Sequence, residues 1–359
     1  MAALKDEISP ALIGTLGAQL ADQWSGFDRD RFEALALDGL IDRQLKARVM
    51  RVAGALAATM PAKPALADRV LRQVLAAGGM QSWASLPVTE YVAATMLEHP
   101  DIALPLLAAL TGRFSAEFAV RPFIETHPEL TLTYLHRWVS DPDEHVRRLA
   151  SEATRPRLPW APQLRGFIAD PTPTIALLDR LFDDDSVYVR RSVANHLNDI
   201  SKDHPELAVD VARRWLTEST HGDYVGRHAL RTLVKKGHPG ALAALGFGAG
   251  DTTEVTSLTC TPDAIPIGGA VTIVFTVNAS TPVRAAIDYR VHYQGANGPK
   301  APKVFKLAVR DLAPGEPVTI SRTLTFDHVS IRRIHPGPHQ IDIQINGAIV
   351  AATTIDITP

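Results

Sequence analysis

The sequence predicts two architectures in one chain, a region of repeated helix pairs followed by an all-β domain. Up to about residue 250, Leu, Ala and Arg dominate and apolar residues recur every three or four positions, which is typical of amphipathic helices. Beyond it, Val, Thr and Ile alternate with polar residues, as in VTIVFTVNAS and HQIDIQINGAIVAATTIDI, which indicates strands. Three helical segments also resemble one another, which indicates an internal repeat.

Length and composition favour a multidomain globular protein. The 359 residues are too many for one ordinary core, and 46% are hydrophobic and 21% charged. No apolar run approaches the roughly 20 residues that span a bilayer, and the charged start MAALKDEISP is unlike a signal peptide. We therefore expect a cytoplasmic protein, nucleoid-associated in a prokaryote, without a membrane partner. The single Cys260 excludes an internal disulfide and a cysteine-based zinc cluster. His335 and His339 lack a matching third ligand, and the sequence has no Gly-rich phosphate loop or zinc-hydrolase motif, so we expect no metal and no cofactor.

The helical repeats share one register. Segments 143–153, 186–196 and 222–232 align on Val146, Val189 and Val225, at separations of 43 and 36 residues. These separations bracket the period of HEAT-like helix pairs, which stack into an α-solenoid and bury their faces against their neighbours. Further helices are expected within 31–60, 64–77 and 88–112. One buried helical stripe is predicted to hold Leu130, Tyr134, Leu135 and Trp138.

The second part of the chain predicts an immunoglobulin-like β-sandwich. About seven strands over roughly 105 residues, without a disulfide, fit that architecture. Asn346-Gly347 between two alternating runs predicts a type I′ hairpin, since that turn needs positive φ at both central residues. The glycine-rich junction GFGAGDTTE separates the two parts. We therefore predict a helical domain over 1–248 and a β-domain over 249–359.

The second helix of each repeat suggests where chemistry could occur. In the helix expected at segment 143–153, Arg148, Glu152 and Arg155 lie together on a face away from the apolar stripe. In the helix expected from segment 186–196 onward, Arg191 and Asp199 lie on the corresponding face. Adjacent repeats would therefore direct Glu152 and Asp199 into one groove surrounded by arginines. The ordinary alternative is a solvated i,i+4 ion pair between Arg148 and Glu152, which stabilises a helix by only a few tenths of a kcal/mol.

A proline-rich turn follows the first of these helices. In RPRLPWAP, Pro156, Pro159 and Pro162 must end the helix and stiffen the chain. Trp160 is then presented from a rigid turn, where its π face can meet a cationic base. Burial in the core is the alternative for any tryptophan.

Net charge argues against a nucleic-acid partner unless positive charge is concentrated on one face. The formal charge is −2, although phosphate binding depends on local potential. We predict that DNA contacts come from arginines of the helical repeats and from a basic loop, 292–306, of the β-domain; the alternative for that loop is simple solubility. The predicted DNA-binding residues are Arg148, Arg155, Arg157, Arg190, Arg191, Arg227, Lys300, Lys303 and Lys306.

The run HVRRLASEATRPRLPW resembles the signature of the AlkC branch of the AlkD/AlkC-type HEAT-repeat DNA glycosylases, and the β-domain resembles the immunoglobulin-like module of one subset of that branch. The resemblance is close over roughly residues 90–245. It implies hydrolysis of the N-glycosidic bond of N-alkylated bases such as 3-methyladenine, 3-methylcytosine and 1-methyladenine, without base flipping. It also implies that Glu152 and Asp199 are catalytic carboxylates, Glu117 a third acidic cleft residue and Trp160 the aromatic wall.

The chemistry is consistent with this assignment. A cationic alkylated base is already a good leaving group, so no general acid is needed, and carboxylates can stabilise an oxocarbenium-like sugar or activate water. We expect no positioned lysine beside Glu152 or Asp199, which predicts a monofunctional glycosylase. The expected partner is double-stranded DNA containing alkylated bases, bound by a monomer. The alternative function is a non-catalytic HEAT-repeat scaffold that binds DNA or a protein, because a fold alone does not settle function.

Overall fold

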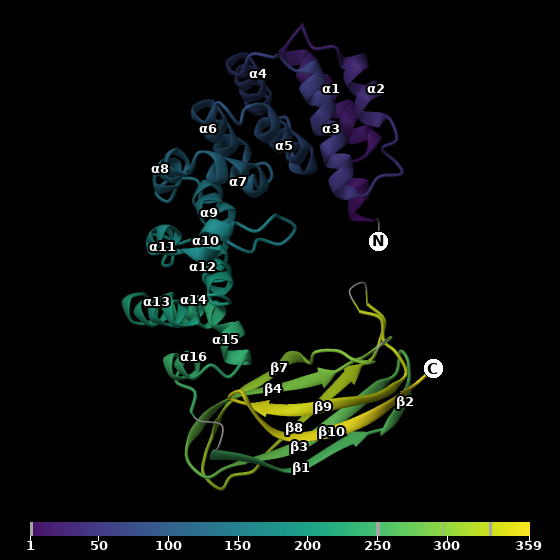
Figure 1. The fold of residues 1–359 in the computed structure, drawn as a ribbon, viewed down its shortest axis with the longest axis vertical. Coiled ribbons are helices and arrows are strands. Elements are labelled where there is room, and N and C mark those ends of the chain that lie inside the picture. The colour runs from purple at the N-terminus through teal and green to yellow at the C-terminus, as the bar shows by residue number, and fades with distance from the viewer. Residues whose placement is uncertain (1–2, 249–251, 297, 330–331) are drawn as a thin grey trace. The chain divides into compact units, whose positions relative to one another are not determined.

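The computed structural model describes residues 3–248, 252–296, 298–329 and 332–359. Helices occupy the chain up to Ala244 and strands begin at Thr253, which confirms the predicted order of helical and β regions (Figure 1). None of the helices in these ranges is both long and apolar enough to cross a membrane. The helices are η1 (Leu4–Glu7), α1 (Pro10–Gln23), α2 (Arg29–Leu37), α3 (Leu45–Thr59), α4 (Pro64–Ala76), η2 (Ser82–Ala84), α5 (Ser85–Thr95), α6 (Pro100–Leu110), α7 (Glu117–Thr126), α8 (Pro128–Trp138), α9 (Glu144–Ala153), α10 (Arg165–Ala169), α11 (Thr172–Leu178), α12 (Val187–Ile200), α13 (Pro205–Glu218), α14 (Gly222–Ala229), α15 (Arg231–Lys235) and α16 (Pro239–Ala244).

The chain forms two compact units. The first comprises Met1–Asp203 and Ser219–Val225, and the second comprises His204–Glu218 and Gly226–Pro359. The second unit therefore contains the last helices together with the strands. The domain boundary predicted between 248 and 249 falls at residues 249–251, which lie outside the described residues.

In the first unit, the helices of successive pairs form two layers. Helices α5, α7, α9 and α12 pack in sequence in one layer, while α4, α6 and α8 pack in the other (Figure 1). The repeat register has a local cause, because α9 and α12 begin with equivalent caps: Asp143 accepts from the His145 N–H at 2.8 Å, and Ser186 from the Tyr188 N–H at 3.2 Å. Val146 and Val189, the residues that align these repeats, are both buried.

Each of the predicted helical segments contains helices, and one residue of the predicted buried stripe in α8 is wrong. The predicted helical segment 31–60 contains two helices, α2 and α3, separated by Gly39 at a φ of 62°. Segment 88–112 likewise spans two helices, α5 and α6, the second of which begins at Pro100. Leu130 is exposed, and Thr131 takes its place in the buried stripe of α8, where its hydroxyl donates to the Phe123 carbonyl at 2.9 Å.

In the second unit, two sheets form the predicted sandwich. Their orders are β1-β3-β8 and β2-β10-β9-β4-β7, and apolar residues from both sheets form one buried cluster. Asn346 and Gly347 have φ values of 46° and 85°, which confirms the predicted hairpin. The strands are β1 (Thr253–Thr261), β2 (Ala264–Pro266), β3 (Ala270–Ala279), β4 (Val283–His292), β5 (Gln294–Gly295), β6 (Gly298–Pro299), β7 (Lys303–Leu312), β8 (Val318–Thr325), β9 (Gly337–Ile345) and β10 (Ala348–Thr358).

Within the second unit, the β9–β10 hairpin is bonded to the segment that precedes the strands. The Gln344 amide donates to the Lys235 carbonyl at 2.9 Å, and the Asn346 amide donates to the Gly248 carbonyl at 2.8 Å. The hairpin thus shares partly buried polar contacts with the end of α15 and with the segment after α16, which agrees with their place in one compact unit.

Candidate active site

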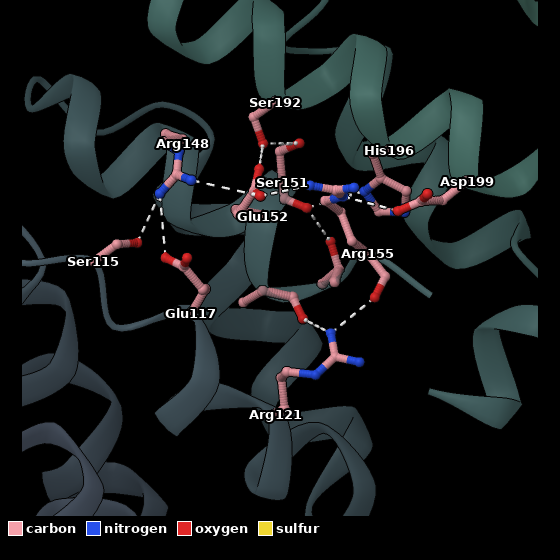
Figure 2. A network of polar contacts seen from close by, with 12 residues as sticks. Ser115, Glu117, Arg121, Arg148, Ser151, Glu152, Arg155, Ser192, His196 and Asp199 are labelled. Carbon is pink, nitrogen blue, oxygen red and sulfur yellow. Dashed lines mark hydrogen bonds and ion pairs between the residues drawn. The ribbon is translucent and has the colours of Figure 1, made fainter. Parts of the chain in front are cut away.

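A chain of alternating charges runs across three helices of the first unit. Acidic and basic side chains from α7, α9, α12 and the segments after α9 and α12 are linked by hydrogen bonds and ion pairs (Figure 2). In order, its members are Glu117, Arg148, Glu152, Arg155, Asp199 and Lys202.

Arg155 joins the two carboxylates that the repeat register predicted to meet. Its Nη1 donates to Glu152 Oε1 at 2.7 Å and its Nε donates to Asp199 Oδ2 at 2.9 Å. All three residues are buried, with exposed fractions of 8% for Arg155, 6% for Glu152 and 2% for Asp199. Burial by itself lowers the pKa of Arg155, but the two carboxylates outweigh it and raise that pKa. The pair of carboxylates is therefore held together by a permanent cation.

Each carboxylate has further donors. Ser192 Oγ donates to Glu152 Oε2 at 2.6 Å, and Arg148 Nη2 lies 3.5 Å from Glu152 Oε1. Lys202 Nζ donates to Asp199 Oδ1 at 2.8 Å. Hydrogen bonds from charged donors are shorter and stronger than those between neutral groups, so both carboxylates are held in fixed positions.

Glu117 closes the other end of the chain of charges. Arg148 Nη1 donates to Glu117 Oε2 at 3.2 Å and to Ser115 Oγ at 2.7 Å, and its guanidinium lies over the Tyr188 ring at 4.7 Å. Burial raises the pKa of Glu117, while Arg148 lowers it. The structure therefore brings together all three carboxylates that the sequence singled out.

His196 lies beneath this network and is fully buried. Its Nδ1 donates to the Ser151 carbonyl at 3.0 Å, one residue before Glu152 (Figure 2). Burial, with the nearby Arg155, lowers the pKa of His196 to about 3, so the ring is neutral. His196 therefore fixes the backbone that carries Glu152 without adding charge. Among the described residues, no group of three His, Cys, Asp or Glu side chains is arranged to hold a metal ion.

Trp160 lies on the segment between α9 and α10, as the prolines predicted. This segment extends away from α11 (Figure 1). The indole is 75% exposed, and the residue has a φ of 68°, in the left-handed region that a bulky side chain rarely adopts. Backbone strain of this kind clusters at functional sites, and an exposed tryptophan favours a partner outside the protein.

Several arginines predicted to bind DNA are used inside the protein instead. Arg155 is buried between carboxylates, and Arg190 is buried and donates to the Asp184 and Asp185 carbonyls ahead of α12. Arg157 forms a bidentate ion pair with Asp203, in which Nε donates to Oδ2 at 2.8 Å and Nη2 donates to Oδ1 at 2.7 Å. The predicted phosphate role of Arg155 and Arg190 is therefore corrected, because both side chains are buried and their donors are occupied by carboxylates or main-chain carbonyls of the protein.

The other predicted cations lie nearer the surface. Arg191 and the three lysines of the β-domain are exposed, and Arg227 is half-buried. Lys303 and Lys306 lie on strand β7 rather than in a loop, whereas Lys300 precedes that strand. These side chains are the ones that a phosphate backbone could reach.

Four residues of the site were missed by the sequence analysis: Arg121, Ser192, His196 and Lys202. Lys202 contradicts the expectation that no lysine lies beside the carboxylates. A signal existed for Ser192 and Lys202, because they lie seven residues before and three after Asp199 and so share its helical face. No local spacing pointed to Arg121, whose partners are 32 to 41 residues away.

Comparisons with known proteins identify the family. The chain matches the family model described as DNA alkylation repair enzyme over residues 114–233, and the C-terminal Ig-like domain of the uncharacterised protein YhaZ over residues 254–359. The protein YhaZ of Bacillus subtilis (strain 168) is 35% identical over 350 residues, which cover 97% of this chain and 98% of the relative.

A solved structure extends this match to the whole fold. Alkylpurine DNA glycosylase AlkC of Pseudomonas fluorescens, bound to DNA containing an abasic site analogue, has a TM-score of 0.92 and 33% sequence identity, and the match covers 100% of both chains. These matches confirm the predicted fold class, family and enzyme class. The chain therefore belongs to the DNA alkylation repair enzyme family, among members that carry a YhaZ-type C-terminal Ig-like domain.

Proposed function

We propose that this chain is a monofunctional DNA glycosylase that hydrolyses the N-glycosidic bond of cationic N-alkylated bases in double-stranded DNA. The proposed substrates are 3-methyladenine, 3-methylcytosine and 1-methyladenine, and the reaction would begin base excision repair in the cytoplasm. The observation that carries this proposal is the pair of buried carboxylates, Glu152 and Asp199, joined by Arg155. The likeness to an alkylpurine DNA glycosylase supports the substrate class.

The chemistry follows from the charge of the substrate. Alkylation of a ring nitrogen leaves the base cationic, so it departs without protonation, and the sugar develops oxocarbenium character at C1′. Preorganised anions stabilise that charge more strongly in a poorly solvated site than in water, and a carboxylate can also orient the attacking water. Glu152 and Asp199 supply these anions, and Ser192 and Arg155 hold them without reorganisation. Because the two carboxylates share one cation, we treat them as a unit.

Trp160 is proposed to contact the lesion while the base stays stacked in the duplex. An enzyme that flips its base encloses it in a tight pocket, whereas this indole is three-quarters exposed on an extended segment. Its π face can attract a cationic base. The exposed Arg191, Lys300, Lys303 and Lys306 are proposed phosphate contacts, which lets a chain of net charge −2 bind DNA through local patches.

The monofunctional assignment now rests on a different argument from the one made on the sequence. A lyase step needs an amine with a free lone pair to attack C1′. Lys202 is close to Asp199, but its Nζ is engaged as a donor to that carboxylate. We therefore expect no covalent product when the enzyme is treated with borohydride during turnover, whereas a trapped complex that is lost in Lys202→Met would show lyase chemistry.

The proposal is tested by the release of free base from methylated duplex DNA under single-turnover conditions. Asp199→Asn and Glu152→Gln should each lower the excision rate constant by about 100-fold or more, which is typical of losing a transition-state charge contact. Duplex binding at low salt should survive in both. No released base from the unaltered protein at stoichiometric amounts would refute the proposal.

Asp203→Asn is the matched control. Asp203 is also an ion-paired carboxylate and lies four residues from Asp199, but its partner Arg157 is outside the network around Glu152. We expect its excision rate constant to stay within about threefold of the unaltered enzyme, because an ion pair that solvent still reaches contributes little. A loss as large as that of Asp199→Asn would mean that the rates report general damage to this region.

A further inference from the structure

Among the described residues, no carboxylate lies within ion-pair distance of the buried Arg121, although Glu125, one turn along α7, attracts it electrostatically. Arg121 lies on α7 and is 4% exposed. Burial lowers the pKa of Arg121 to about 10, so the guanidinium is still charged at neutral pH. A buried charge is costly unless its donors are satisfied, so the groups that satisfy it indicate why it is there.

Its partners are three main-chain carbonyls from one short stretch of chain. Nη1 donates to the carbonyl oxygens of Ala153 and Arg155 at 2.9 and 2.8 Å, and Nη2 donates to that of Pro162 at 2.5 Å (Figure 2 shows Arg121 with its neighbours). Ala153 ends α9, where carbonyls lack partners within the helix. Pro162 lies at the far end of the proline-rich turn. One guanidinium therefore joins both ends of the segment that presents Trp160.

The same guanidinium acts on both parts of the proposed site. Through the carbonyl of Arg155 it holds the backbone of the residue whose side chain joins Glu152 and Asp199. Through Pro162 it holds the turn in which Trp160 has a positive φ. A strained backbone persists only where its surroundings determine it, and Arg121 supplies such surroundings.

We infer that Arg121 is a positioning residue that fixes Trp160 relative to the Glu152–Asp199 pair. It does not reach the substrate itself, since it is buried and its donors are directed at the backbone. The inference rests on the proposed function, because Trp160 and the carboxylates must act on one nucleotide for their relative position to matter.

Arg48 provides a matched control within the same unit. It is also buried, at 5% exposed, and also donates to main-chain carbonyls, those of Lys5, Ile8, Ile41 and Arg43. These carbonyls belong to the first helices and their connections. Arg48→Met should therefore cause the same kind of structural loss as Arg121→Met, without touching the segment of Trp160.

The experiment compares Arg121→Met with Arg48→Met in the full-length protein, well below their unfolding temperatures. The first measurement is the single-turnover excision of 3-methyladenine from duplex DNA. The second is acrylamide quenching of Trp160 fluorescence, taken as the difference between each chain and the same chain with Trp160→Phe. We expect Arg121→Met to lower the excision rate constant about 30-fold and to change the Trp160 quenching constant at least about 1.5-fold. Arg48→Met should change the excision rate constant by less than about twofold and the quenching constant by less than about 1.2-fold.

Equal excision losses in the two variants, or an unchanged Trp160 quenching constant in Arg121→Met, would overturn the inference. If Arg121→Met does not fold, Arg121→Lys replaces it, since one nitrogen in place of two reaches fewer of the three carbonyls. Normal excision and quenching in that variant would also overturn it. If the unaltered protein excises nothing, the proposed function fails, but the quenching comparison still decides whether Arg121 holds the segment of Trp160.

Discussion

The Ser192 hydroxyl lies 2.6 Å from Glu152 Oε2 and donates to it, in a position where both residues are buried. A hydrogen bond to a charged group contributes about 1.5–3 kcal/mol, and its loss leaves a buried acceptor unsatisfied. We expect Ser192→Ala to slow single-turnover excision about 10-fold, because Glu152 loses the donor that fixes its orientation. Stability should fall by about 1–3 kcal/mol in urea unfolding.

Ser201→Ala separates the two effects of this change. Ser201 is buried at the end of the same helix, but its hydroxyl donates to the Asn198 carbonyl at 2.9 Å and not to a carboxylate. It should lose stability without losing excision. If both serine variants excise at the rate of the unaltered enzyme, Glu152 does not depend on Ser192.

A second prediction concerns the pH dependence of stability in the β-domain. Burial raises the pKa of Asp288 from its ordinary value of 3.8 to about 6, while Lys235 and Lys306 oppose the shift. Between these two values the folded protein keeps a proton that the unfolded chain releases, so this residue makes stability fall as pH rises from 3.8 to about 6. Asp288→Asn should therefore stabilise the protein at pH 8 by about 1–2 kcal/mol, and by almost nothing near pH 4.

The control for Asp288 is Asp356→Asn, which removes an exposed carboxylate from the same five-stranded sheet. Its unfolding midpoint should follow the unaltered protein at both pH values. A gain from Asp288→Asn that is as large at pH 4 as at pH 8 would show that packing, and not the charge, is responsible.

How much of the site could be predicted depends on how far apart along the sequence the interacting residues lie. Val146 and Val189 recur at the repeat period, so periodicity alone placed Glu152 and Asp199 on neighbouring helices. The turn at Asn346 was predictable because its φ values are a local property. Periodicity cannot say whether a guanidinium turns toward solvent or between two helices, since that depends on how closely the helices pack.

Arg155 and Arg190 show the limit most clearly. Both stand beside prolines or polar turns in a basic stretch, which favoured a phosphate role. Arg155, however, is buried between nearby Glu152 and distant Asp199, and Arg190 turns back onto the Asp184 and Asp185 carbonyls just ahead of its own helix. Arg121 is a stronger case, because its partners are backbone carbonyls, and a carbonyl carries no residue identity for a sequence pattern to show. Buried arginines that bind backbone are therefore the functional residues least visible in a sequence.

A third prediction concerns the close approach of Gly347 and Gly237. A Cβ on Gly347 would overlap the Gly237 Cα, and Gly347 also has a φ of 85°. Both the backbone conformation and the contact exclude a side chain, so Gly347→Ala should cost about 3 kcal/mol or more and lower the apparent Tm. Gly315→Ala is the control, because Gly315 has a φ of 72° with nothing within 4 Å of an added Cβ. Only its conformational cost, about 1 kcal/mol, should appear; equal losses would mean that the contact between the glycines is not close in solution.

The last prediction concerns the proposed phosphate contacts of the β-domain in a chain of net charge −2. Each lysine that neutralises a phosphate releases counterions, so the logarithm of affinity falls by about 0.9 per contact per decade of salt. Replacing Lys300, Lys303 and Lys306 with Gln should reduce that salt slope by about 2–3, and should weaken binding to undamaged and methylated duplex alike. Arg310→Gln, which changes another exposed cation of β7, should leave the slope nearly unchanged. A triple variant with the original slope would show that these lysines serve only solubility, and the phosphate contacts would then have to come from the helical unit, where Arg191 is exposed.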